Sequence, residues 1–340
     1  MALRMVEIFV PTEKEKQLRE LLEEHKSIDI WSDRISESRT LIRVLVPSEE
    51  TEAVLDELGK RFTHLEDFRM VLLPVAACFP RPEELEKEEK TCAEEAEKSV
   101  PKLSRISRAE LYTNIDEMSK LTKTYVVMVL LSTVVAAIGI MRSNVAVIVG
   151  AMVIAPLLGP NVALSFGTTL GDVKLIRRAL KSNLVGILFA LAVAVVIGLF
   201  FFEMKHSNIE VMTRTEATLG DIALALAAGA AGALSLTVAA PAALIGVMVA
   251  VALLPPLVTF GMLMGAGECR LAFGAMLLLL VNLICINLAG VLTFLLQGVR
   301  PLTWWEADRA KKATRIAIIL WLGLLAALAV LIIISQEVGF

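Results

Sequence analysis

The chain has 340 residues, 56% of them hydrophobic, and a formal net charge of −3. This apolar fraction is too high for a single soluble domain and places the chain among membrane proteins. Long basic clusters are absent, and the three histidines and four cysteines show no metal-ligand spacing. We therefore expect no nucleic-acid partner, no metal and no cofactor. Charged residues concentrate in 1–123 whereas 124–340 is mostly Ala, Leu, Val, Ile and Gly, which predicts a soluble front domain and a membrane body.

The front domain, residues 1–79, alternates strand and helix patterns. Strands are predicted at 3–10, 28–35, 40–46 and 67–75 from β-branched residues and partial alternation. One helix follows Pro11 and runs to about His25, and a second follows Pro47 and carries Val54, Leu55 and Leu58. The order βαββαβ predicts a soluble α+β domain of the ferredoxin-like class, facing the cytoplasm.

This front domain resembles regulatory modules of the ACT type. The resemblance implies binding of a small effector through a Gly-bearing turn after the first strand. Here that turn is Val10-Pro11-Thr12-Glu13 and contains no Gly. We therefore favour oligomer contacts or partner docking over effector sensing, and both remain open because a fold alone does not give a function.

Residues 80–123 are predicted to connect the two parts. The stretch 81–98 is rich in Glu and Lys and predicts a solvated, charged helical linker. From Ser104 to Lys123, apolar residues recur at nearly helical spacing. This amphipathic helix is expected to lie at the membrane surface.

The region 124–340 predicts an all-α polytopic membrane domain. A hydrocarbon core of about 30 Å needs about 20 apolar residues per crossing helix. Seven segments qualify: 124–141, 144–169, 183–202, 219–238, 241–266, 272–297 and 314–334.

The second and fifth segments match each other and contain prolines. Gly150–Pro160 aligns without a gap with Gly246–Pro256, which begins 96 residues later, and ten of 32 pairs are identical when the alignment covers 144–175. This identity predicts an internal repeat, with one copy at about 124–202, a second at about 219–297 and an extra helix at 314–334. Because each copy has three spans, the second copy would be inverted.

Basic residues are distributed unevenly between the predicted loops. If all seven segments cross, an N-terminus in the cytoplasm and a C-terminus outside put most Lys and Arg inside, as the positive-inside rule requires. We therefore expect a multi-pass protein of the cell membrane. The inside loops hold Lys174, Arg177, Arg178, Lys181, Arg300, Arg309, Lys311, Lys312 and Arg315, and the outside loops hold Arg142, Lys205, Arg214 and Arg270.

The prolines of the matched segments predict two broken helices and a transport site. A proline lacks the N–H that bonds the carbonyl four residues back, and free polar groups must be satisfied within a membrane. Kinked helices satisfied by their neighbours are the alternative, and full crossings and re-entrant pairs both remain open. The candidates for the solute or ion path are Asn144, Gly150, Met152, Pro156, Gly159, Pro160, Asn161, Ser165, Thr168, Gly246, Val251, Pro255, Pro256, Thr259, Asn282 and Asn287.

For each polar side chain in this set, a hydrogen bond between helices is the plain alternative. Four charged residues at span ends are candidates for gates or for solvated caps, of which caps are favoured: Asp172, Lys174, Glu268 and Arg270. No charged residue lies deep in a predicted span, which disfavours a central carboxylate proton relay.

The run from Arg142 to Pro160, with Gly-Ala-Met-Val-Ile-Ala-Pro-Leu inside it and Leu170-Gly171-Asp172 after it, looks like the signature of a prokaryotic membrane family. That family is described only as domain of unknown function 389. The resemblance covers roughly 120–300 and implies a bacterial or archaeal polytopic membrane protein. It implies no substrate and no catalytic residues.

Two functions compete. The first is a transporter or channel for an unknown small solute or ion, with its site at the duplicated breaks and a front domain that regulates or oligomerises. The second is a membrane-anchored sensor or scaffold without transport. An enzyme is not expected, because HExxH, GxSxG and P-loop motifs are absent. Small-residue faces such as 225–233 predict tight helix packing, and we expect a homo-oligomer in the lipid bilayer.

Overall fold

In the computed structural model the chain forms two compact units, Met1–Tyr112 and Thr113–Phe340. The structure describes the backbone of residues 3–25, 27–65, 67–75, 106–201, 209–237, 242–299 and 304–338, and the side chains of the same residues except 242–252, 304–313 and 335–338. The charged linker predicted at 81–98 lies outside these residues.

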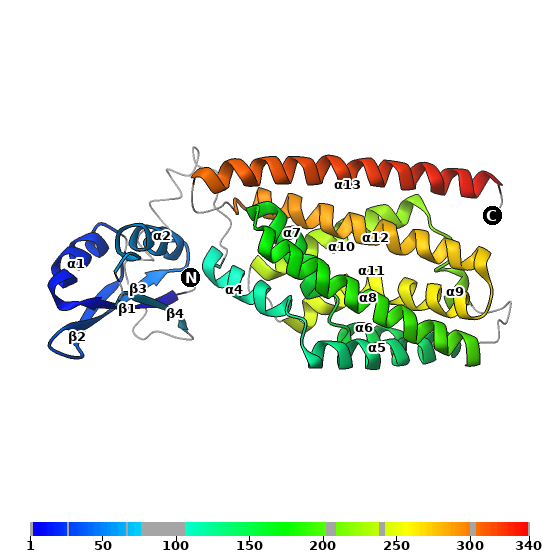
Figure 1. Cartoon of the computed structure of the whole chain (residues 1–340), viewed down its shortest axis with the longest axis horizontal. Helices are drawn as coiled ribbons and strands as arrows, with labels where there is room; N and C mark the ends of the chain where they lie inside the picture. The colour runs from blue at the N-terminus through cyan, green and yellow to red at the C-terminus, as the bar shows by residue number, and fades with distance from the viewer. Residues whose placement is uncertain are drawn as a thin grey trace, which may run out of the picture. The chain divides into compact units, whose positions relative to one another are not determined.

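The first unit is a small antiparallel sheet with two helices (Figure 1). The element order is that predicted from the sequence, and the strands lie in the order β2-β3-β1-β4. Its elements are β1 (Leu3–Pro11), the 3-10 turn η1 (Thr12–Lys14), α1 (Glu15–Glu23), β2 (Asp29–Arg34), β3 (Arg39–Pro47), α2 (Thr51–Phe62) and β4 (Arg69–Val75).

One face of this sheet and both helices make the core of the unit. The register pairs Val6 with Val44 and Ile8 with Ile42, so these four side chains point to the same face. They pack with Leu18, Leu22 and other buried residues of the two helices. The alternating pattern along β1 follows from this burial, because successive side chains of a strand point to opposite faces.

The second unit is helical, and the boundary between the units falls within α4. Leu111 and Ile115 of α4 are buried, so these side chains are not the exposed apolar face expected at a membrane surface. The helices are α4 (Arg108–Met118), α5 (Lys123–Met141), α6 (Val145–Ile154), α7 (Leu158–Leu170), α8 (Val173–Phe201), α9 (Ile209–Met212), α10 (Leu219–Thr237), α11 (Ala242–Gly265), α12 (Cys269–Leu296) and α13 (Trp304–Val338).

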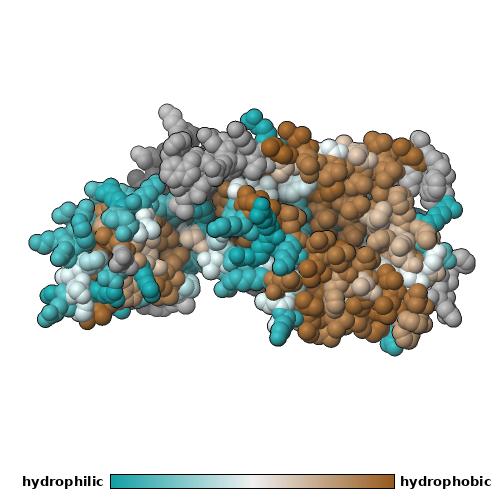
Figure 2. Space-filling model, in the orientation of Figure 1, coloured by the Kyte–Doolittle hydropathy of each residue, from teal (hydrophilic) through white to brown (hydrophobic). Residues whose placement is uncertain are grey.

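Within the described residues, five helices are long and apolar enough to cross a membrane, namely α5, α8, α10, α12 and Thr314–Ile334 of α13. The bent pair α6 and α7 would make a sixth. The face of this unit drawn in Figure 2 is largely apolar, and large hydrophobic side chains such as Leu184, Phe200 and Ile316 are exposed on the unit. These properties are those of a multi-pass membrane protein.

Three helices make most of the contacts in this unit: α8, α11 and α12, of which α11 packs against α5, α6, α7, α8, α10 and α12. α8 packs against α5, α7 and α11, and α12 packs against α7, α10, α11 and α13. In the 18-residue apolar window of α12, 78% of the residues are buried, whereas in that of Thr314–Ile334 only 6% are buried. α12 is therefore a central helix, and α13 lies alongside it at the periphery (Figure 1).

The prediction of two proline-broken helices is wrong for the second one. The first segment breaks at Ala155, where ψ is 122° because Pro156 disfavours a helical conformation in the preceding residue, and α6 and α7 meet at a bend of 54°. α11 continues through Pro255 and Pro256 without a break. In the alignment the partner of Pro156 is Ala252, so the proline that breaks the first segment is missing from the second.

Candidate functional site

The break between α6 and α7 places the first turn of α7 inside the protein. Leu157 is the N-cap residue and provides no side-chain hydrogen bond, and Gly159 is buried. A methyl group on Gly159 would lie 2.3 Å from the carbonyl oxygen of Met118, the last residue of α4. The absence of a side chain at Gly159 therefore allows the end of α4 to pack directly on this turn.

Three asparagines from three helices meet one turn further along α7. Asn161 and Asn183 of α8 donate to each other: Asn161 Nδ2 lies 3.1 Å from Asn183 Oδ1, and Asn183 Nδ2 lies 3.0 Å from Asn161 Oδ1. Asn287 of α12 donates to Asn161 Oδ1 at 3.2 Å, and Ser165 donates to Asn287 Oδ1 at 3.2 Å. We call Asn161, Ser165, Asn183 and Asn287 the amide cluster.

Every member of the amide cluster is at most 5% exposed. Asn161 also donates to the Leu157 carbonyl at 2.8 Å, and Asn287 donates to the Leu283 carbonyl at 2.8 Å. With these bonds Asn161 uses both donors and both acceptor positions of its amide. The cluster is thus a satisfied network that joins α7, α8 and α12, as the hydrogen-bond alternative for these residues predicted.

Sequence reasoning named Asn161, Ser165 and Asn287 but missed Asn183. The predicted apolar segment began at Asn183, so that residue was treated as a boundary. α8 begins ten residues earlier, at Val173, which puts Asn183 well inside the helix. The signal was available, because an asparagine that continues a helical pattern into an apolar run has to find a partner there.

Thr259 of α11 behaves differently from the amide cluster. It is 1% exposed, and its Oγ1 has no hydrogen-bond partner within the described part of the chain. Pro255 and Pro256 are buried one turn before it. This turn combines a free hydroxyl with two residues that lack an N–H.

Several other predicted residues lie at helix ends. Asn144 is the exposed N-cap of α6 and accepts from Val147 N at 3.2 Å. Asp172 accepts from Lys174 N at 2.9 Å and Leu175 N at 3.1 Å, and so caps the start of α8. The contacts of Asp172 agree with the cap alternative, whereas Asn144, predicted on the path or bonded between helices, caps its own helix.

The remaining candidates do not form one site. Thr168 Oγ1 bonds the Leu164 carbonyl of its own helix, Met152 and Asn282 are buried, and Gly150 is exposed with open space beside it. Gly246 and Val251 lie in the part of α11 whose side chains are not described. Lys174, Glu268 and Arg270 are exposed, and Pro160 is tolerated in the first turn of α7, where N–H groups have no partner within the helix.

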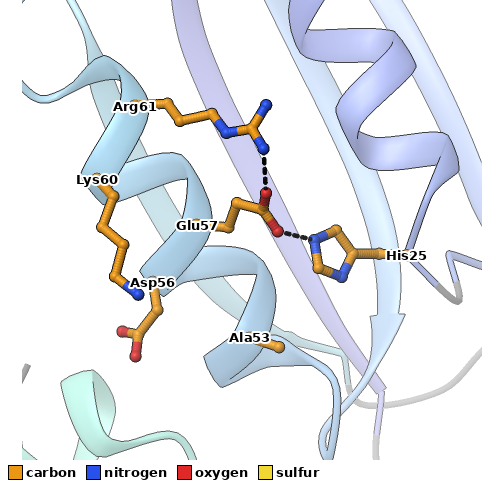
Figure 3. Close-up of a pocket in the computed structure, with 6 residues that line it drawn as sticks. All are labelled: His25, Ala53, Asp56, Glu57, Lys60 and Arg61. Carbon is orange, nitrogen blue, oxygen red and sulfur yellow. Dashed lines mark hydrogen bonds and ion pairs between the residues drawn. The ribbon is translucent and has the colours of Figure 1, made fainter.

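The first unit has a groove that the sequence did not predict. It measures about 570 Å³ and lies on α2 beside the loop after α1. Figure 3 shows Glu57 between Arg61 and His25, with Arg61 Nη2 at 2.7 Å and His25 Nε2 at 2.9 Å from its carboxylate. The lining residues are His25, Ala53, Asp56, Glu57, Lys60 and Arg61.

Comparisons with known proteins extend over the whole chain. The family described as "Domain of unknown function (DUF389)" matches residues 152–288, which include the break between α6 and α7 and the whole amide cluster. An uncharacterised protein of Methanocaldococcus jannaschii is 34% identical over 336 residues, which are 98% of this chain and 99% of the archaeal protein. No solved structure matches the chain significantly.

Proposed function

Since the chain belongs to the family described as domain of unknown function 389, a description that assigns no activity, we propose from the geometry that its helical unit is a transporter or channel for a small solute or ion. The broken segment α6–α7 and the matching part of α11 would carry the path. The first unit would be a ferredoxin-like regulatory or oligomerisation domain, because β4-β1-β3-β2 is the strand order that a βαββαβ chain gives when each pair is antiparallel.

Matching helix ends support an internal repeat in the helical unit. α5 runs from Lys123 to Met141, and both bounds shifted by 96 residues give those of α10, Leu219–Thr237. The same shift takes the start of α8 at Val173 to the start of α12 at Cys269.

The turns before α8 and α12 also match. Gly171 has a φ of 69° and Gly267 a φ of 82°, and these two glycines are 96 residues apart. Positive φ is accessible to Gly at low cost, so each turn needs this residue. The identical spacing supports two copies of one helix-turn-helix unit.

The observation that carries the proposal is a pair of exchanged contacts. A methyl group on Gly261 of α11 would lie 2.5 Å from Ala194 Cβ of α8, and one on Gly290 of α12 would lie 2.7 Å from Ser165 Oγ of α7. Adding 96 to Ser165 and Ala194 gives 261 and 290. Ser165 is thus equivalent to Gly261, and Ala194 is equivalent to Gly290. The contact between α7 and α12 therefore corresponds to the contact between α11 and α8, as expected for two halves related by a two-fold axis.

A second pair of contacts follows the same rule. The rings of Phe166 and Phe294 lie 5.2 Å apart, and their equivalents are Met262 and Gly198. A methyl group on Gly198 would lie 2.2 Å from the Met262 carbonyl oxygen. Three spans per copy would make the halves inverted. Inverted halves with a helix interrupted at their interface are a known design of transporters, and in this chain the interrupted segment is α6–α7 of the first half.

A proteoliposome flux assay tests this proposal. The purified full chain would be measured with a panel of inorganic ions and small polar solutes, beside Pro156→Ala, which removes the cause of the α6–α7 break. Gly323→Ala of α13, outside the proposed path, is the control, because a methyl group there meets nothing within 4 Å. We expect flux in the parent and control and a loss in Pro156→Ala. Equal flux in all three proteins would show that the break is not part of the path. Absence of flux in the parent with every ion and solute of the panel would overturn the proposal of transport.

The groove on α2 favours a second candidate, a membrane-anchored sensor or scaffold. His25, Lys60 and Arg61 place cationic or ionisable groups beside two carboxylates, a setting in which a charged effector can bind. Absence of flux together with binding of a small effector at residues 1–79 would select this function. In either case we propose a homo-oligomer in the cell membrane with its N-terminus in the cytoplasm and its C-terminus outside, which basic residues in the loops support.

A further inference from the structure

The first turns of α8 carry cationic side chains on one face of the helix. Lys174, Arg177, Arg178 and Lys181 lie at positions i, i+3, i+4 and i+7, a spacing that puts residues on the same side of a helix. All four residues are exposed. We call them the basic stripe, which is about 10 Å long at 1.5 Å per residue.

Nearby carboxylates do not neutralise the basic stripe. Asp116 of α4 forms an ion pair with Arg178, and Lys120 approaches the same carboxylate at 3.7 Å. Among the residues that the structure describes, the other three members of the basic stripe form no ion pair. Even with Asp172, which caps the first turn of α8, the cations outnumber these carboxylates. Positive charge is therefore left over at the surface.

α8 is longer than the apolar layer that it would cross. Its 29 residues, Val173–Phe201, extend over about 43 Å, whereas the hydrocarbon core of a bilayer is about 30 Å thick. With the apolar end at Phe201 inside the core, about nine residues project beyond it at the other end. These are the turns that carry the basic stripe, so its cations lie at the level of the lipid headgroups.

The same face of α8 becomes apolar as the helix continues. Leu184 and Leu188 follow Lys181 by three and seven positions, and they are 59% and 54% exposed. Figure 2 shows the hydrophilic start of α8 beside the hydrophobic surface of the helical unit. Cations followed by exposed leucines on one face match the two parts of a phospholipid, which are a charged headgroup and acyl chains.

We propose that the basic stripe binds the headgroup of an anionic phospholipid whose acyl chains lie along Leu184 and Leu188. Clusters of Lys and Arg next to a transmembrane helix attract anionic lipids. A soluble anion of the same headgroup chemistry would gain nothing from the leucines. The inference goes beyond the proposed function, and it does not depend on transport.

The equivalent helix start in the second half lacks this surface. Ninety-six residues after the basic stripe, the first turns of α12 hold Arg270, Phe273, Gly274 and Leu277, so one cation remains of the four. Leu277 is 2% exposed, and a methyl group on Gly274 would meet the Thr215 backbone. The start of α12 is thus packed against protein where that of α8 is open. We expect the lipid at one end of the helical unit.

Titration of the full chain with defined lipids tests the site. The midpoint of thermal unfolding would be followed in an uncharged detergent at one ionic strength, with dioleoyl phosphatidylglycerol, dioleoyl phosphatidylcholine or soluble glycerol phosphate added. We expect phosphatidylglycerol to raise the midpoint saturably, because a ligand that binds the folded state stabilises it. Phosphatidylcholine should need a concentration at least about tenfold higher, since its headgroup has no net charge.

Two results of this titration would overturn the proposal. Equal midpoint shifts with the two lipids would show that the cations do not select an anionic headgroup. An equal shift with glycerol phosphate and phosphatidylglycerol would show that the basic stripe binds a soluble anion and that the leucines play no part.

The double variant Arg177→Gln/Lys181→Gln tests the residues. A cation beside an anionic lipid contributes about fivefold in affinity, so the half-maximal concentration of phosphatidylglycerol should rise about 25-fold. Lys16→Gln/Arg19→Gln on α1 is the control, because it removes the same two charges from exposed positions of the first unit. It should keep the lipid dependence of the parent. An unchanged half-maximal concentration in the first variant, or an equal rise in both, would overturn the assignment.

Discussion

The two halves of the helical unit share their helix ends but differ in polarity at equivalent positions. Asn161 and Asn183 in the first half have Leu257 and Leu279 as equivalents, 96 residues later. Leu257 is 1% exposed, so the second position is as buried as the first. The third asparagine of the amide cluster, Asn287, has Leu191 as its equivalent.

The two interfaces are therefore held by different means. The α7–α12 interface uses side-chain hydrogen bonds of the amide cluster. At the α8–α11 interface, Gly198 and Gly265 bring backbones together, since a methyl group on either would lie 2.2 Å from a carbonyl oxygen of the other helix. Close backbone approach through small residues and polar side-chain bonds are the two ways in which helices associate in a membrane. One packing geometry can thus be kept while its chemistry changes.

The largest loss of stability is expected when α11 receives the proline of the first half. Ala252→Pro places a proline at the position equivalent to Pro156, inside a continuous helix. We expect a loss of about 3 kcal/mol or more, because the ring clashes with the carbonyl four residues back and removes a hydrogen bond. Unfolding by a denaturing detergent measures the loss. A loss below about 1 kcal/mol would mean that α11 bends as readily as α6–α7.

The next largest loss of stability is expected when the close contact between α8 and α11 at Gly198 is forced open. In Gly198→Ala the new methyl group meets the Met262 backbone, so α8 and α11 must separate. We expect a loss of about 2–3 kcal/mol, as for other overpacked sites. Gly323→Ala is a matched control with open space around it, and it should not lower stability. Equal stability of both variants would contradict the close contact.

Replacing one asparagine of the amide cluster should lower the stability more than replacing all three. Asn161→Leu leaves the amides of Asn183 and Asn287 short of partners, and we expect a loss of about 2 kcal/mol. Changing Asn161, Asn183 and Asn287 together to Leu gives each position the leucine found at its equivalent in the other half. That triple variant should recover part of the stability, because no partner is left unpaired. If the triple variant were less stable than Asn161→Leu, the loss in the single variant would not come from unpaired amides, and the remaining hydrogen bonds of the amide cluster would themselves stabilise the fold.

The smallest loss of stability is expected when the Ser165 hydroxyl is removed from the amide cluster. Ser165→Ala removes the bond to Asn287 and should cost about 1 kcal/mol. Ser235→Ala is the control, because among the described residues that hydroxyl bonds only the Ala231 carbonyl of its own helix. Denaturation of both variants under the same conditions gives the difference, and equal losses would show that the contact between helices adds nothing.

Apolar runs predicted the helices well, because length and hydropathy directly reflect burial in a bilayer or a core. The starts of α5 and α10 lie within one residue of the predicted spans. α8 and α13 begin ten residues earlier than predicted, at Val173 and Trp304, because their first turns are polar and hydropathy does not register them.

The candidate site was harder to predict. The prolines were read as a pair of equivalent breaks, although the one that acts on the backbone, Pro156, has Ala252 as its partner. Which asparagines meet depends on how three helices pack, and no local pattern contains that information. That the Thr259 hydroxyl has no partner among the described residues is equally invisible in a sequence, because a threonine in a helix normally bonds its own backbone.

The matching turns at Gly171 and Gly267 have a consequence for the origin of the chain. If the halves arose from one duplicated gene, the ancestral three-helix product had to insert into the membrane in both directions, so that two copies could meet as an antiparallel dimer. Fusion into one polypeptide would have removed that requirement, since the direction of the first copy would dictate that of the second. Each copy would then have been free to change on its own, and the difference between Asn161 and Leu257 would be one such change.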